Sequence, residues 1–119
     1  MTVQQIKDGN KMIAEFMGLS YKAKTEHPLV FPDGLWMDKK TKVGYNELFY
    51  HSSWDWLMPL VEKIERMGGH ITIGTNKIEC QFQDFRGSSK VGFGYTKIQC
   101  VWEVIVEFIK WYNTQNPKQ

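Results

Sequence analysis

The chain has 119 residues, of which 42% are hydrophobic and 24% are charged, and its formal net charge is +2. This length predicts one domain, residues 1–119, with a single core and too little further chain for an elaborate cofactor cleft. The small net charge excludes a strong overall field for polyanions, so nucleic-acid binding would depend on a local basic patch.

The first predicted element is an N-terminal helix. Asp8 or Asn10 can cap it, and the apolar residues between Met12 and Met17 follow with one-sided helical spacing. Gly18 stands where a glycine commonly ends a helix, so the helix should stop there.

The segment after this helix predicts a connection and then a hairpin. Pro28 and the turn sequence PDG at 32–34 predict an irregular connection over residues 19–35. Two short apolar runs then flank DKKTK at 38–42, which predicts a hairpin with a polar tip.

The segment YHSSWDWLMPLVEKIERM, residues 50–67, predicts the second helix. Ser52 and Asp55 have the S-x-x-D spacing of a capping box, and two glycines follow the helix. Pro59 removes one backbone hydrogen bond and should kink the second turn, unless the regular helix begins near it. One face is apolar and is expected in the core: Trp54, Leu57, Met58, Val61 and Ile64.

The region from 70 to 95 predicts strands. In HITIGTNKIECQFQ, residues 70–83, apolar and polar residues alternate on both sides of the turn sequence GTN, which predicts a hairpin. DFRGSSK at 84–90 predicts a polar loop, and VGFGY at 91–95 predicts a short third strand that its glycines weaken.

The last element is a long helix. Thr96 and Gln99 have capping-box spacing, and a wide apolar arc follows between Ile98 and Tyr112. The polar tail, about 114–119, is expected to fray. The fold class is therefore α+β: an antiparallel sheet of three to five strands on two or three helices, in the order α-(ββ)-α-ββ(β)-α.

The residues give little support for catalysis or metal binding. His51, Ser52 and Asp55 are neighbours at a helix start, where side chains rarely face one another as a triad requires. An enzyme with His51 as general base is therefore the last-ranked hypothesis. The histidines and cysteines lack ligand spacing, so neither metal nor cofactor is expected: His27, His51, His70, Cys80 and Cys100.

Aromatic residues make up 14% of the chain, more than one small core can hold, so some are expected at a surface that meets a partner. Trp54 and Trp102 fall on apolar stripes and are expected in the core. Trp56 and Trp111 fall at stripe edges, so they are either exposed for binding or complete the core.

Two basic segments are candidate binding surfaces for protein or RNA. The sequence RGSSKVGFGYTK at 86–97 resembles the aromatic strand of RNA-recognition folds, although Val91 interrupts the pattern. The second segment is the hairpin tip, which with the first could contact an acidic protein or an RNA backbone. The candidate residues are Arg86, Lys90, Phe93, Tyr95, Lys97, Lys39, Lys40 and Lys42.

The compartment is predicted to be the cytoplasm, with reduced thiols. The polar N-terminus lacks a secretory signal, and Glu103 and Glu107 interrupt the longest apolar stretch, so no membrane contact is expected. The wide apolar arc of the last helix makes a homodimer an open alternative to complete burial within one chain.

Three segments, NKMIAEFMG (10–18), YHSSWDWLMPLVEKIE (50–65) and VEFIKWYN (106–113), resemble a group of small, uncharacterised bacteriophage and prophage proteins. The resemblance implies a mobile-element origin, and it carries over no catalytic residues to this chain. Small phage proteins of this size are often inhibitors of host defence, among them anti-CRISPR proteins, including inhibitors of the RNA-targeting type VI nuclease.

The sequence thus leaves three hypotheses. The first is a non-enzymatic inhibitor that binds a host nuclease, or its guide-RNA complex, in the bacterial cytoplasm through its basic segments and edge aromatics. The second is a small module that binds RNA or single strands through Phe93, Tyr95, Arg86 and Lys90. The third is the enzyme based on His51.

Overall fold

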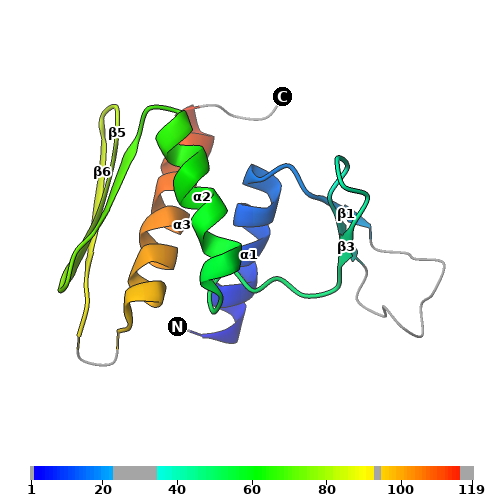
Figure 1. Ribbon diagram of the computed structural model, residues 1–119, viewed down its shortest axis with the longest axis horizontal. Coiled ribbons are helices and arrows are strands. Elements are labelled where there is room, and N and C mark those ends of the chain that lie inside the picture. Colours follow the sequence, from blue (N-terminus) through cyan, green and yellow to red (C-terminus); the bar gives the residue numbers. More distant parts are fainter. Residues whose placement is uncertain (1, 23–34, 93–94, 116–119) are drawn as a thin grey trace. The chain divides into compact units, whose positions relative to one another are not determined.

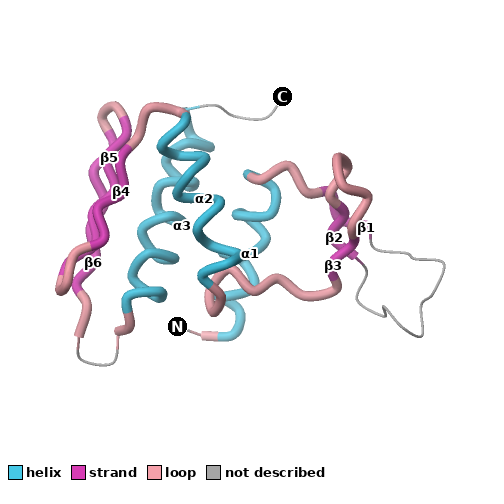
Figure 2. Tube along the Cα trace, viewed as in Figure 1, coloured by secondary structure: helices cyan, strands magenta, loops and turns pink. Residues whose placement is uncertain are grey.

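The computed structural model describes residues 2–22, 35–92 and 95–115 (Figures 1 and 2). These residues form three helices and two three-stranded antiparallel sheets, which confirms the α+β class and the predicted order of elements. The strands form two sheets, whereas the sequence predicted one. The chain divides into two compact units, the N-terminal unit (1–48) and the C-terminal unit (49–119).

Helix α1 (Val3–Phe16) opens the N-terminal unit with a capping box that the sequence reading missed. The Thr2 hydroxyl accepts the Gln5 N–H at 3.1 Å, and the Gln5 side chain accepts the Thr2 N–H at 2.8 Å. The predicted caps Asp8 and Asn10 are wrong, because both lie inside the helix. The first two turns are polar, so apolar spacing alone did not reveal them. Gly18, with φ +86°, ends the helix as predicted.

The first sheet has the order β1 (Ser20–Lys22), β2 (Leu35–Met37), β3 (Gly44–Tyr45). The predicted hairpin is confirmed, since β2 pairs with β3 and the Asp38 carboxylate accepts two N–H groups of the tip. Strand β1 lies at the start of the segment 19–35, where the sequence predicted an irregular connection, so that prediction is wrong for these three residues. It pairs with β2, and the rings of Tyr21 and Trp36 lie 5.2 Å apart. Residues 23–34, with the predicted turn at 32–34, lie outside the described residues.

Helix α2 (Trp54–Arg66) begins the C-terminal unit, and its cap differs from the prediction. Ser53 is the N-cap residue and makes no side-chain capping hydrogen bond, so the box of Ser52 and Asp55 is wrong. The helix continues through Pro59 and ends at Gly68, whose φ is +101°.

The buried face of α2 is rotated relative to the predicted one. Leu57, Leu60, Val61 and Ile64 are buried. Trp54 and Met58 were expected in the core but are 39% and 38% exposed. Leu60 extends the buried stripe on the side away from Trp54 and Met58, which lie beyond its opposite edge.

The second sheet has the order β4 (His70–Ile73), β5 (Lys77–Phe82), β6 (Phe85–Lys90). The predicted hairpin of β4 and β5 is confirmed. Strand β6 corrects the predicted loop at 84–90: Phe82 pairs with Phe85 across a two-residue turn in which Gln83 has φ +51°. The third strand predicted at 91–95 is wrong, since Gly92 and Tyr95 form only an isolated bridge. Phe93 and Gly94 lie outside the described residues.

Helix α3 (Lys97–Gln115) has the predicted capping box. The Thr96 N–H donates to the Gln99 side chain at 3.0 Å, and the Gln99 N–H donates to the Thr96 hydroxyl at 3.3 Å. The helix includes residues 114 and 115, which were expected to fray. Figure 1 shows α2 and α3 on the same side of the second sheet, with α3 against β5 and β6 and α2 against β4. Eight residues of α3 between Cys100 and Ile109 are buried.

The core of the C-terminal unit lies between the sheet and these helices. Ile78, Cys80 and Phe82 point inward from alternate positions of β5 and are buried. The inner positions of β6 carry Gly87 and Ser89, and the Ser89 hydroxyl lies 3.5 Å from the Glu103 carboxylate of α3. Among the described residues, no helix is long and apolar enough to cross a membrane.

Candidate functional site

The outer face of the second sheet is a polar, exposed surface created by strand alternation. In an antiparallel sheet with one covered face, every second residue points to solvent. The register aligns His70, Gln81 and Arg86 in one row and Thr72, Glu79 and Ser88 in the next. Lys77 and Lys90 complete the last row. We call the three rows, all of whose members are exposed, the outer face.

Lys77 and Lys90 form the closest kind of cross-strand pair. The Gly74 N–H donates to the Lys77 carbonyl, so the backbone groups of Lys77 point toward β4. On the β6 side, the adjacent Val91 N–H donates to the Asn76 carbonyl at 2.9 Å. Lys77 and Lys90 are therefore a non-hydrogen-bonded pair, in which Cα atoms are about 4.5 Å apart and side chains are nearest.

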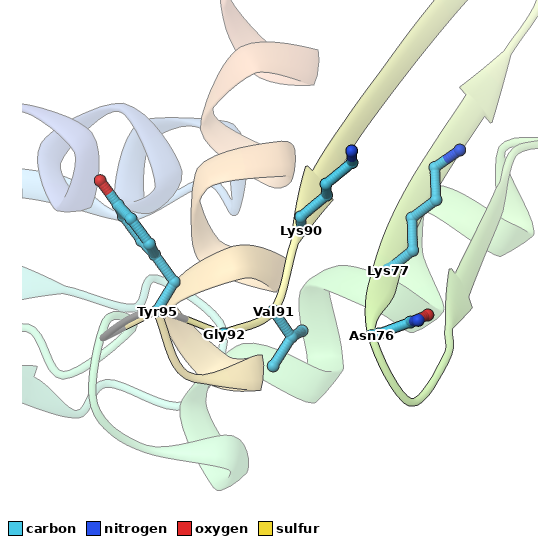
Figure 3. Close-up of a pocket in the computed structure, with 6 residues that line it drawn as sticks. All are labelled: Asn76, Lys77, Lys90, Val91, Gly92 and Tyr95. Atoms are coloured by element: carbon cyan, nitrogen blue, oxygen red, sulfur yellow. The ribbon is translucent and has the colours of Figure 1, made fainter.

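A hollow of about 490 Å³ opens beside this pair, at the end of the sheet (Figure 3). The two lysine side chains extend in the same direction from neighbouring strands, and Tyr95 lies on the far side of Lys90 from Lys77. Tyr95 is 50% exposed and directly precedes the capping residue of α3. The hollow is lined by Asn76, Lys77, Lys90, Val91, Gly92 and Tyr95.

The positive side chains of the outer face differ in their partners. Lys77 Nζ lies 2.9 Å from a Glu79 carboxylate oxygen in an exposed ion pair. Arg86 Nη1 donates to the carbonyls of Gln83 and Phe85 at 3.0 and 3.1 Å, which holds the guanidinium near the β5–β6 turn. For Lys90 the described residues supply no ion pair.

The structure separates the residues that the sequence proposed for binding. Arg86 and Lys90 lie on the outer face, and Tyr95 lines the hollow. Lys97 is exposed at the first position of α3. Phe93 lies outside the described residues. The exposed lysines Lys39, Lys40 and Lys42 form a separate basic cluster on the β2–β3 turn of the N-terminal unit.

The two edge tryptophans are half-buried in aromatic clusters. Trp56 has its ring 5.6 Å from that of Phe49 and 5.1 Å from that of Tyr50, in edge-to-face contacts. Trp111 lies 6.0 Å from Phe82 and 5.6 Å from Phe85. Each ring thus packs against neighbouring rings and keeps part of its surface exposed.

The described candidate groups for chemistry lie on different elements of the C-terminal unit. Among the described residues, no three His, Cys, Asp or Glu side chains are placed to hold a metal ion. His51 and Ser52 do not line the hollow described above. Burial raises the pKa of the Cys80 thiol to about 11, which keeps it protonated and a poor nucleophile at neutral pH. Cys100 is also buried, and its thiol donates to the Lys90 carbonyl at 3.3 Å.

Sequence reasoning missed Asn76, Lys77 and Glu79, which join Lys90 only through the register of β5 and β6. The alternation in KIECQF could have placed Lys77 and Glu79 on one face. It could not place them beside Lys90, because β6 was read as a loop. Comparisons with protein-family models, curated proteins and solved structures give no match to this chain.

Proposed function

We propose that this protein is a non-enzymatic interaction protein that binds an anionic partner through the outer face of β4–β6. The observation that carries the proposal is the alignment of Arg86, Lys77 and Lys90 on one exposed sheet face whose opposite face is covered by helices. Cationic side chains fixed on a rigid sheet steer an anionic partner and define its orientation.

The resemblance to phage proteins supplies the proposed partner. It implies a stoichiometric inhibitor of host defence, with an RNA-targeting type VI CRISPR nuclease or its guide-RNA complex as target. A complex of protein and guide RNA carries phosphate groups at its surface, and these can bind the cationic side chains of the outer face, of which Lys90 has no ion pair among the described residues. Arg86 and Lys90 lie about 13 Å apart along β6, so one partner surface can contact both.

The test is co-purification of the tagged protein from bacterial cells that express a type VI nuclease and its guide RNA, with and without ribonuclease treatment. The double variant R86E/K90E should lower recovery of the nuclease at least about tenfold, because like charges then oppose the partner. The matched control is K110E, which reverses an exposed lysine that is ion-paired on α3. Failure to recover the nuclease with the unaltered protein refutes this partner.

Direct binding of RNA or single strands is the second candidate function. Tyr95 is half exposed and lines the same hollow as Lys90, which favours this function because bases stack on exposed aromatic side chains in positively charged grooves. Purified protein should then bind a single-stranded oligonucleotide at low salt with a steep salt dependence. Absence of binding at low salt removes this candidate and leaves the protein partner.

A further inference from the structure

The pairing of Lys77 with Lys90 is an unfavourable arrangement that an anion would relieve. Like charges directly opposite each other destabilise an antiparallel pair. The non-hydrogen-bonded geometry brings these two side chains closer than any other pairing would. Glu79 offsets one of the two charges through its ion pair with Lys77. Since that pair is exposed on both sides, it contributes little and exchanges readily for a stronger anion.

The hollow supplies a neutral donor beside these two charges. Asn76 belongs to its lining, and its side-chain amide can donate a hydrogen bond to an anionic oxygen. The volume of about 490 Å³ falls within the range of sites for small organic ligands and exceeds the need of a bare inorganic ion. The ligand that fits these features is an anionic oxygen group attached to a larger body.

We infer that this hollow is a phosphate-binding site in which one phosphate group sits between the ammonium groups of Lys77 and Lys90. The inference rests on the proposed function and deepens it by naming the chemistry that the outer face recognises. A lysine ammonium acts on phosphate as a point charge and gives charge-assisted hydrogen bonds without a fixed fork. On binding, Lys77 exchanges the Glu79 carboxylate for the phosphate, and Lys90 gains a counterion.

The phosphate could come from free phosphate, from a mononucleotide or from a nucleic-acid backbone. Titration calorimetry with inorganic phosphate, uridine 5′-monophosphate and a short oligouridine separates these sources. Substitution Y95A should weaken the nucleotide and the oligonucleotide only, because the ring can contact a base but not a bare phosphate. A loss of affinity for inorganic phosphate as large as the loss for the nucleotide would contradict a base contact by the Tyr95 ring.

The lysines are tested by neutral substitution. For the tightest of the three ligands, K90Q should lower affinity about tenfold and K77Q/K90Q about 100-fold, as expected for lost charge-assisted hydrogen bonds. For oligouridine, each lysine removed should reduce the slope of log affinity against log salt by about 0.7. The matched control is K110Q, since Lys110 is an exposed lysine paired with a carboxylate, as Lys77 is.

Substitution E79Q gives a change of opposite sign. Removal of the competing carboxylate should raise phosphate affinity about threefold or more, whereas E107Q, which changes the net charge equally beside Lys110, should not. Circular dichroism confirms that each variant is folded. Affinities of K77Q/K90Q and E79Q that equal that of the unaltered protein would overturn the phosphate site, as would the absence of binding of all three ligands at low salt.

This outcome is distinguishable from failure of the proposed function. If the unaltered protein recovers the nuclease and R86E does not, while none of the three ligands binds in calorimetry, the inference is overturned alone. If phosphate binds and no nuclease is recovered, the site stands and the proposed partner falls.

Discussion

At the scale of single residues, the buried thiol of Cys80 links the fold to pH. Burial raises its pKa from 9.0 to about 11, so the folded chain holds this proton more tightly than the unfolded chain. The stabilisation is complete below pH 9 and is lost as pH rises toward 11. We expect the free energy of unfolding to fall by up to about 1.4 kcal/mol per pH unit in this window. Urea titrations at pH 8 and pH 10 measure this fall for the unaltered protein and for Cys80→Ala. The fall should be smaller in Cys80→Ala, and an equal fall in both proteins would show that Cys80 is not responsible.

Gly69 is a second residue whose role can be tested alone. A Cβ atom at this position would lie 2.7 Å from Ile64 Cγ2 and 3.1 Å from the backbone oxygen of Gln81. The backbone oxygen belongs to β5 and cannot rotate away, so Gly69→Ala should destabilise the fold by about 1–3 kcal/mol. Thermal unfolding measures this loss. A variant as stable as the unaltered protein would show that α2 and β5 can separate at little cost.

At the scale of elements, the start of α3 depends on its capping box. Thr96→Ala removes the acceptor of the Gln99 N–H and should cost about 1 kcal/mol in urea unfolding, whereas Thr96→Ser should retain most of the stability. Equal losses from both substitutions would contradict a role for the hydroxyl group.

The elements also show which parts of the fold local sequence signals can predict. The box of Thr96 and Gln99, the helix-ending glycines and both hairpins depend on neighbours in the chain, and these predictions are confirmed. Strand β6 was missed because Gly87 and Ser89 disfavour strands. Their small size nevertheless suits a face on which α3 packs, as the contact of Ser89 with Glu103 indicates.

The candidate site, too, could be predicted only where a local sequence signal exists. Arg86, Lys90 and Tyr95 could be selected because one short segment combines basic and aromatic residues. Lys77 and Asn76 join them through strand pairing, which links distant positions and has no local signal. The prediction that Trp54 lies in the core was wrong for the same reason. Which face of α2 is buried depends on what packs against that helix, and Leu60 is buried while Trp54 is partly exposed.

At the scale of the whole molecule, the wide apolar arc of α3 was the argument for a homodimer. Within the C-terminal unit, the second sheet and α2 pack against this helix, and the core residues Val104, Ile105 and Ile109 are buried. These buried residues therefore offer no large apolar face to a second copy.

We accordingly expect a monomer with the chain mass of 14.0 kDa in multi-angle light scattering. The exposed apolar side chains near the start of α2 test this expectation, since Phe49, Trp54 and Met58 are each about two-fifths exposed. If these residues are too few to drive association, Trp54→Glu leaves the measured mass unchanged, because three side chains cover far less than the area that a stable dimer buries. If the unaltered protein has the mass of a dimer and Trp54→Glu has the mass of a monomer, the expectation is contradicted. Self-association would then occur through α2 and not through the apolar arc of α3.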